Sequence, residues 1–241
     1  MEALIRKGTF HGKPRIGLDL DGVVFGSVHR VLDVVAKKNG VRIEYEKLKS
    51  YAIHDHIPGS TSKQISEIFS WLWKHRSEKI RMMDPSIPRI VKALQHHFEI
   101  NITTQAAGGD MEVFPNIVRI LRNNGIPYDR LFHVNSIKEK TELGFEIYIE
   151  DNYNMLKHIG KTQHLILMPQ PWVIEYVRRN QHMGTGRRFI SDPSPSELRR
   201  YNDSLYGENA EGMTILPGGD LKTAWLNINR LMLQGLRRHG A

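Results

Sequence analysis

Hydrophobic and polar positions along the chain predict strands that alternate with helices. Short apolar stretches rich in β-branched residues indicate strands, and apolar positions three and four apart between them indicate helices. The clearest such helix covers residues 110–124 and is followed by Gly125, a typical C-terminal cap. Five strands joined by helical crossovers favour an α/β fold, a Rossmann-like parallel sheet flanked by helices. The predicted strands cover residues 15–20, 98–104, 131–135, 145–151 and 164–168.

The alternation is interrupted directly after the first predicted strand. Apolar positions there predict one helix from Ser27 to Gly40 and a second over about 62–80. We interpret this segment as a small helical cap inserted into the sheet domain. The predicted division is a core of residues 1–24 and 85–182, a cap of residues 25–84, and a C-terminal extension of residues 183–241 without an assigned role.

Composition narrows the class of protein. Hydrophobic residues make up 40% of the 241 positions and charged residues 25%, which is ordinary for a globular protein. No apolar run approaches the length that spans a bilayer, so no membrane partner is expected. Cysteine is absent, which excludes disulfides and thiolate metal sites. We therefore expect a cytoplasmic protein.

The net charge of +8 and the pI near 9.6 favour anionic partners. Nucleic acids, nucleotides and other phosphorylated metabolites all satisfy this condition. Lysine and arginine are spread along the chain instead of clustered. Charge alone therefore does not choose among these partners.

Acidic residues close two of the predicted strands. Asp19 and Asp21 lie one residue apart before Gly22, and Glu150 and Asp151 end the strand "FEIYIED". In a parallel sheet, chemistry gathers at the carboxyl ends of the strands. Four carboxylates at one edge form a hard oxygen site that suits Mg²⁺. The sequence therefore predicts a magnesium site there.

A hydroxyl pair and two lysines complete a set of groups for phosphoryl transfer. Thr103 and Thr104 end the strand "FEINITT", and Lys138 and Lys140 begin the helix before the acidic strand. Carboxylates, a hydroxyl, a cation and a metal ion are the groups that stabilise charge on a transferring phosphoryl group.

The motifs "LDLDG", "ITT", a lysine and "YIEDN", in this order, resemble those of the haloacid dehalogenase (HAD) superfamily of aspartate-nucleophile phosphohydrolases. The sequence is most similar to the 5'-nucleotidase branch typified by the pyrimidine 5'(3')-deoxyribonucleotidases, which has a helical cap after the first motif. Segments like "DPSIPRIVKAL" and "MPQPW" add to this likeness, which covers about residues 15–180. The sequence departs from the pattern of this family in two places. The Ser-Pro that often follows the threonine of the second motif is absent, and the fourth motif begins with Glu instead of Asp.

The resemblance implies roles for the first two motifs. Asp19 would attack phosphorus and form an aspartyl-phosphate, and Asp21 would protonate the leaving group and then activate water. Both residues would also bind the metal ion, and Asp21 would do so through its backbone carbonyl oxygen. Thr103 would hold a phosphoryl oxygen, with Thr104 assisting.

The resemblance also implies roles for the last two motifs. Lys140 stands ten residues before Glu150, the spacing expected of the active-site lysine, and Lys138 is the alternative. Glu150 or Asp151 would complete the magnesium site, and the sequence leaves open which of them binds the metal.

Three aromatic residues are candidates for substrate binding. Trp71 points away from the apolar stripe of its predicted helix, and Trp73 flanks that stripe, so either could stack on a nucleobase. Phe25 follows the first motif and could line the pocket from below. Packing within the cap or at a homodimer contact is nevertheless the favoured interpretation for both tryptophans, and a core position beside the cap hinge is an equal alternative for Phe25.

These observations lead to a functional expectation with alternatives. We expect a magnesium-dependent phosphatase that removes the 5'-phosphate of a nucleotide or deoxynucleotide. One alternative is a phosphatase for another small phosphate ester or a nucleic-acid end. The other is a nucleic-acid-binding protein on a retired phosphatase fold, against which the four intact carboxylates argue.

Overall fold

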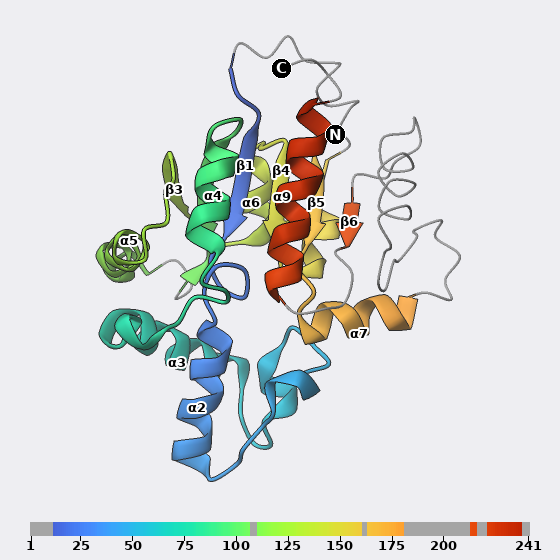
Figure 1. Ribbon diagram of the computed structural model, residues 1–241. Helices are drawn as coiled ribbons and strands as arrows, with labels where there is room; N and C mark the ends of the chain where they lie inside the picture. Colours follow the sequence, from blue (N-terminus) through green and yellow to red (C-terminus); the bar gives the residue numbers. More distant parts are fainter. Residues whose placement is uncertain (1–11, 107–109, 161–162, 181–212, 216–220, 238–241) are drawn as a thin grey trace.

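A six-stranded parallel sheet forms the centre of the protein (Figure 1). The computed structural model describes residues 12–106, 110–160, 163–180, 213–215 and 221–237. The strand order is β3-β2-β1-β4-β5-β6, and each neighbouring pair is parallel. The strands are β1 (Arg15–Asp19), β2 (Glu99–Thr104), β3 (Arg130–His133), β4 (Ile147–Glu150), β5 (His164–Leu167) and β6 (Met213–Ile215).

Helices cover both faces of the sheet, which confirms the predicted α/β class. Alternate residues of a strand point to opposite faces. Ile16 and Leu18 of β1 belong to a buried cluster with α4, α5 and α9, whereas Tyr148 and Leu165 belong to a second cluster near α6 and α7. The core helices are α4 (Ile87–Gln95), α5 (Phe114–Asn123), α6 (Ile137–Glu142), α7 (Pro171–Asn180) and α9 (Leu221–Arg237), with 3-10 turns η5 (Met111–Val113) and η6 (Tyr153–Lys157).

The five predicted strands are present, each within three residues of its predicted bounds. A sixth strand, β6, was not predicted. It pairs with β5, and the following helix α9 packs against α4 with Trp225, Ile228 and Met232 buried in the core cluster. Two elements of the segment 183–241 therefore add to the sheet domain. The residues between 181 and 212 lie outside the described part of the chain.

The cap is a helical insertion between β1 and α4, and in Figure 1 it lies beyond the carboxyl ends of the strands. It contains α2 (Ser27–Asn39) and α3 (Ser62–His75), which pack on each other, and the 3-10 turns η1 (Tyr45–Lys47), η2 (Ile53–His56) and η3 (Ser77–Lys79). The chain enters and leaves through two segments joined by hydrogen bonds from Gly26 N to Arg81 O (2.8 Å) and from Met83 N to Val24 O (2.9 Å).

The C-terminal end of α3 is tied to the core. Asn116 Nδ2 on α5 donates to the carbonyl oxygens of Trp73 (3.0 Å) and Lys74 (2.8 Å). Lys74 Nζ also lies 2.6 Å from Asp110 and 2.9 Å from Glu112. Helix α3 is therefore fixed relative to the sheet at the end nearest the first motif.

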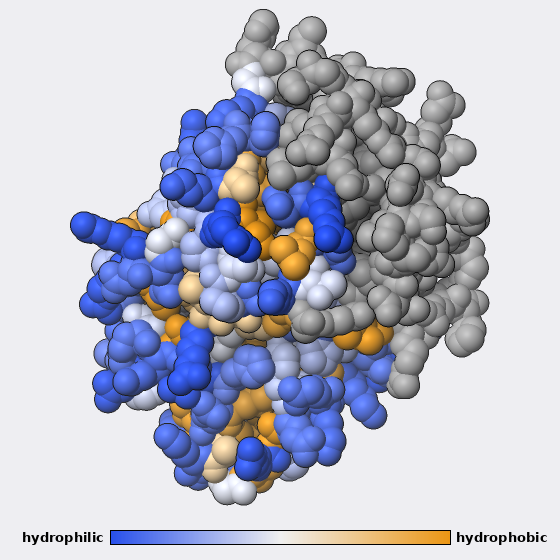
Figure 2. All heavy atoms as spheres, in the orientation of Figure 1, coloured by the Kyte–Doolittle hydropathy of each residue, from blue (hydrophilic) through white to orange (hydrophobic). Residues whose placement is uncertain are grey.

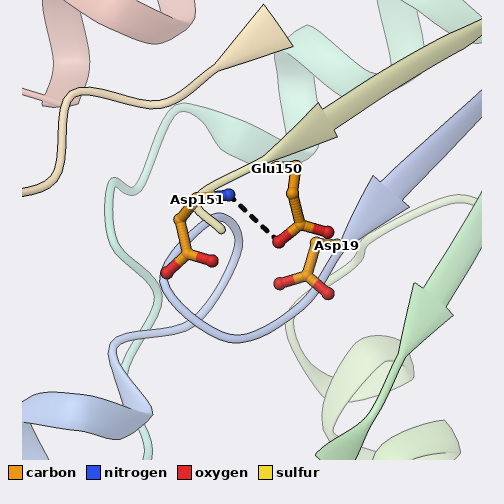
Figure 3. A group of neighbouring side chains, drawn as sticks. All are labelled: Asp19, Glu150 and Asp151. Atoms are coloured by element: carbon orange, nitrogen blue, oxygen red, sulfur yellow. Dashed lines mark hydrogen bonds between the residues drawn. The ribbon is translucent and has the colours of Figure 1, made fainter. Parts of the chain in front are cut away.

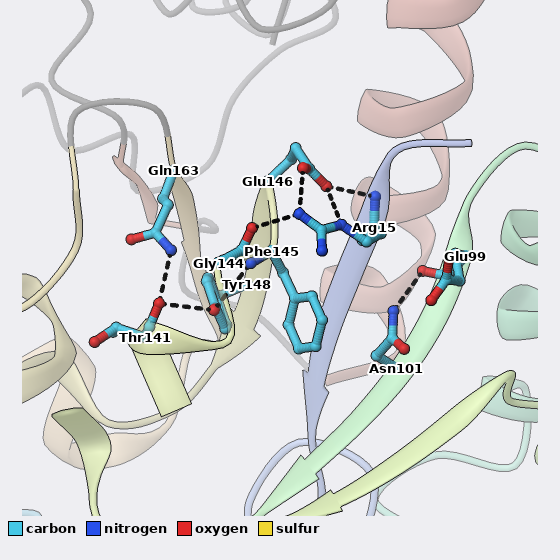
Figure 4. A network of polar contacts seen from close by, with 9 residues as sticks. All are labelled: Arg15, Glu99, Asn101, Thr141, Gly144, Phe145, Glu146, Tyr148 and Gln163. Carbon is cyan, nitrogen blue, oxygen red and sulfur yellow. Dashed lines mark hydrogen bonds and ion pairs between the residues drawn. The ribbon is translucent and has the colours of Figure 1, made fainter. Parts of the chain in front are cut away.

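A polar network holds β1 and β4 together at the opposite, amino-terminal end of the sheet (Figure 4). The guanidinium of Arg15 contacts both carboxylate oxygens of Glu146 at 2.8 and 3.2 Å and donates to Gly144 O at 2.7 Å. Nearby, Tyr148 Oη donates to Lys140 O at 2.9 Å. Through this bond β4 supports the helical turn that carries Lys140.

The face of the described residues seen in Figure 2 is mainly hydrophilic, with hydrophobic residues in separate patches. Among the helices of the described ranges, none has the length and apolar character needed to cross a bilayer.

Candidate active site

Three carboxylates meet where β1 and β4 end. The side chains of Asp19, Glu150 and Asp151 point toward one another (Figure 3). Each offers an oxygen, and these oxygens lie within 4.8 Å of one another. All three residues are buried. The pairing of β1 with β4 therefore forms an acidic site, as we predicted from the acidic residues at the ends of these two strands.

Lys140 on α6 is the cation of this site. Its Nζ lies 2.5 Å from Asp19 Oδ1 and 2.7 Å from Glu150 Oε2, and its side chain is buried. Lys138 instead has a 73% exposed side chain and lies 3.7 Å from Glu142. The geometry therefore favours Lys140 over Lys138 as the active-site lysine.

The site holds more negative than positive charge. Burial and the charge of Glu150 raise the pKa of Asp19 well above its usual range, against the lowering effect of Lys140. Burial, Glu150 and Asp19 likewise raise the pKa of Asp151. Although burial opposes it, attraction by Asp19 and Glu150 keeps the pKa of Lys140 above its usual value. One ammonium faces three carboxylates, and a divalent cation bound among their oxygens would restore the balance.

Glu150 and Asp151 differ in how the protein holds them. Glu150 Oε1 accepts hydrogen bonds from the amides of Asp151 (3.1 Å) and Asn152 (3.2 Å), while Oε2 accepts from Lys140. Asp151 Oδ2 lies against Gly22, where an added Cβ would come within 2.0 Å of that oxygen. Gly22 also has φ +79°, a conformation that favours glycine. The glycine of the first motif therefore leaves room for the Asp151 carboxylate.

Asp21 stands apart from the three clustered carboxylates. Trp73 Nε1 donates to Asp21 Oδ1 at 3.2 Å. Burial raises the pKa of Asp21 to about 6, against the lowering effects of the Ser27 hydroxyl and the Trp73 indole. A carboxyl group with this pKa can both donate and accept a proton near neutral pH.

The three aromatic residues predicted to bind substrate lie elsewhere. Trp73 is fully buried behind Asp21, and Phe25 is buried beside it with ring centroids 6.2 Å apart. Trp71 is 44% exposed and lies along an open cleft on the outer side of α3 with Lys63 and His75. The helical-wheel argument separated the two tryptophans correctly, but it could not show which side of α3 faces the strand ends.

A cavity of about 470 Å³ opens onto the acidic site between core and cap. The clustered carboxylates, Asp21 and Lys140 lie at its core side. Sequence reasoning did not select several lining residues as site residues, although Trp172 lies in the quoted segment "MPQPW" and Gln105 directly follows the "ITT" motif. These residues are Tyr51, His54 and Phe69 from the cap and Gln105 and Trp172 from the core.

The two threonines at the end of β2 have different surroundings. Thr103 pairs in register with Asp19, and within the described part of the chain its buried hydroxyl has no hydrogen-bond partner. Thr104 Oγ1 accepts from Ala106 N at 2.9 Å. The Thr103 hydroxyl therefore lies buried and unpartnered at the end of β2, next to the strand end that carries Asp19, whereas Thr104 stabilises the turn after β2.

Comparisons with known proteins find similar solved structures but no sequence match. No protein-family model and no curated protein matches the sequence. A crystal structure of an L-2-haloacid dehalogenase is similar at 11% identity with a TM-score of 0.41, covering 91% of this chain and 99% of the other. Independently of that likeness, the buried acidic cluster at the carboxyl ends of a parallel α/β sheet is compatible with the binding of a divalent cation.

Proposed function

We propose that the protein is a magnesium-dependent phosphomonoester hydrolase of the HAD type that acts on nucleoside or deoxynucleoside 5'-monophosphates. The observation that carries this proposal is the contact of Lys140 with both Asp19 and Glu150 beside Asp151. An aspartate held by a lysine, next to further acids and below a cap, suits attack on phosphorus.

The donor set fits a hard divalent cation. Asp19 and Asp151 would hold Mg²⁺ through carboxylate oxygens, and Glu150 would orient Lys140 and the following backbone amides. When bound, Mg²⁺ would neutralise charge on the phosphoryl oxygens and on the carboxylates that approach them.

The residues of the chain can carry two successive displacements. Asp19 Oδ attacks phosphorus, the ester P–O bond breaks, and the leaving oxygen takes a proton from the carboxylic acid of Asp21. The Asp21 carboxylate then takes a proton from water, whose oxygen attacks the aspartyl-phosphate. The P–O bond to Asp19 breaks, and inorganic phosphate leaves.

Lys140 and Thr103 support both steps. The Lys140 ammonium stays next to Asp19 and stabilises the negative charge that develops on the transferring group. The unpartnered Thr103 hydroxyl donates to a phosphoryl oxygen beside Asp19.

The size and the lining of the cavity support the proposal of a small-molecule substrate. Its volume of about 470 Å³ lies in the usual range for small-molecule sites. Aromatic side chains of Tyr51, Phe69 and Trp172 line it and offer faces for a nucleobase. A cap over the site leaves less room for a nucleic-acid strand, so the mononucleotide is preferred over a strand end.

Phosphate release tests this function. Purified protein is assayed with nucleoside and deoxynucleoside 5'-monophosphates, sugar phosphates and a 5'-phosphorylated oligonucleotide, with Mg²⁺ or with EDTA. We expect Mg²⁺-dependent release from mononucleotides, lost in Asp19→Asn and kept in Asp33→Asn, which changes an exposed acid on α2. Release only from sugar phosphates would contradict the nucleotide assignment. Halide release from 2-chloropropionate without phosphate release would contradict the phosphatase.

A further inference from the structure

The turn after β5 and the first residues of α7 hold two carbonyl groups of the active-site loops. Gln170 Nε2 donates to Gly22 O, and Trp172 Nε1 donates to Asp151 O at 2.9 Å. Both donor side chains are almost completely buried. One short segment therefore fixes the backbone beside Asp21 and the backbone of Asp151.

Two cap residues contact this segment: Tyr51, whose ring lies edge-on to Trp172 with centroids 6.2 Å apart, and Tyr45 in η1. The Tyr45 hydroxyl donates to Gln170 Oε1 at 2.5 Å, and the Tyr45 ring packs edge-on against Trp172 with centroids 5.7 Å apart. His29 on α2 stacks on Tyr45 with a centroid distance of 3.7 Å. Burial raises the pKa of Tyr45, so the hydroxyl remains a donor at neutral pH. Tyr45 is thus held by the cap while it bonds to the core.

These contacts depend on the position of the cap. Tyr45 and His29 both lie in the insertion, whereas Gln170, Trp172 and Gly22 lie in the core. A cap that rotated away from the sheet would break the bond between Tyr45 and Gln170. Gln170 would then lose the partner that orients its amide toward Gly22 O.

A shift of Gly22 would reach the carboxylates. Gly22 lies so close to Asp151 that a Cβ on it would overlap Asp151 Oδ2. A movement of the Gly22 carbonyl therefore changes the space available to the Asp151 side chain and the position of neighbouring Asp21. The cap is therefore connected to the acidic residues of the site through the contacts of Tyr45, Gln170 and Gly22.

We propose that Tyr45, acting through Gln170, is a positioning residue that couples the position of the cap on the sheet to the geometry of Gly22 and the adjoining acids. Its kinetic consequence rests on the proposed function, whereas the coupling itself is a property of the fold. Substrate that draws the cap shut would by this coupling also order the loop of the first motif.

Four variants test the coupling: Tyr45→Phe, Gln170→Met, the double variant, and Tyr128→Phe as a control near β3. Tyr45→Phe removes one hydroxyl and leaves the buried Gln170 oxygen without that donor, a change that corresponds to about a tenfold effect. We expect kcat for a nucleoside monophosphate to fall about tenfold with a much smaller change in KM. The double variant should lose no more than Gln170→Met alone, because the hydroxyl acts through Gln170.

Hydrogen–deuterium exchange separates failure of the coupling from failure of the proposed function. In Tyr45→Phe we expect the amides of residues 20–25 to exchange about fivefold faster than in the wild type and in Tyr128→Phe. This measurement needs neither catalysis nor metal. Unchanged exchange would overturn the proposal, as would an effect of Tyr45→Phe that is just as large in the Gln170→Met background. If Gln170→Met does not fold, the comparison of amide exchange rates between Tyr45→Phe and Tyr128→Phe is sufficient to test the proposal.

Discussion

Lys140 Nζ lies 2.5 Å from Asp19 Oδ1, although 121 positions separate the two residues in the sequence. The same ammonium lies 2.7 Å from Glu150 Oε2. Helix α6 thus carries a buried cation to the carboxyl ends of β1 and β4. This contact joins the first, third and fourth motifs into one site.

Replacement of Lys140 by methionine should abolish activity and destabilise the fold. The change leaves two buried carboxylates without their cation, which typically costs about 3–5 kcal/mol of unfolding free energy. Phosphate release measures the first effect, and urea unfolding in EDTA measures the second. Lys138→Met removes an exposed lysine on the same helix and should change neither quantity. Equal behaviour of the two variants would show that Lys140 has no special role.

Trp73→Phe should lower the rate without unfolding the protein. The variant keeps an aromatic ring in the core and removes the N–H that donates to Asp21 Oδ1. Loss of this donor raises the pKa of Asp21 further and frees its orientation, so we expect kcat to fall about tenfold. Trp71→Phe changes the exposed tryptophan two positions earlier and should leave kcat unchanged. A larger loss in Trp71→Phe would instead support a substrate contact for that residue.

Gly22→Ala should damage the site more than an ordinary glycine substitution. The alanine would adopt φ near +79° and place its Cβ within 2.0 Å of Asp151 Oδ2. Gly40 has a similar φ of +69° with no atom within 4 Å of an added Cβ, so Gly40→Ala isolates the cost of the backbone conformation, about 1 kcal/mol. We expect activity to be lost in Gly22→Ala and retained in Gly40→Ala. Retained activity in both variants would contradict the close packing of Gly22 on Asp151.

The buried His164 should make stability depend on pH below about 6.5. Burial lowers the pKa of His164 from 6.5 to about 3, so the unfolded chain takes up a proton that the folded chain does not. Its stabilising contribution is complete above pH 6.5 and is lost as the pH falls toward 3, by about 2 kcal/mol at pH 5. Urea unfolding at pH 7.5 and 5.0 measures this loss. His164→Gln should reduce the difference between the two pH values, and exposed His158→Gln should not.

The sequence was sufficient for the parts of the fold and site that depend on local pattern. Period-two and helical spacing located the five strands, and strand ends placed Asp19, Thr103 and Glu150 near one another because parallel strands share an edge. The choice of Lys140 over Lys138 came from the family resemblance, which implies an active-site lysine ten residues before Glu150. Strand β6 escaped prediction because it is three residues long and follows a polar stretch without clear periodicity.

The parts that depend on how the cap sits on the sheet could not be predicted. Hydrophobic spacing on α3 shows which residues are apolar, but not which side faces Asp21; Trp73 therefore became a substrate candidate although it is a buried hydrogen-bond donor. Tyr45 and Gln170 are 125 positions apart, and although Gln170 belongs to the quoted segment "MPQPW", nothing in the sequence indicates that the two side chains meet. The same holds for Tyr51, which enters the cavity from the cap.

Covalent trapping on Asp19 tests the central claim most directly. The protein is mixed with Mg²⁺ and its best nucleoside monophosphate, quenched in acid during turnover, digested and analysed by mass spectrometry. We predict one phosphoryl group on the peptide that contains Asp19, assigned to that residue by fragmentation and absent from Asp19→Asn. Full turnover with no phosphoryl group on Asp19, together with an active Asp19→Asn variant, would contradict the account.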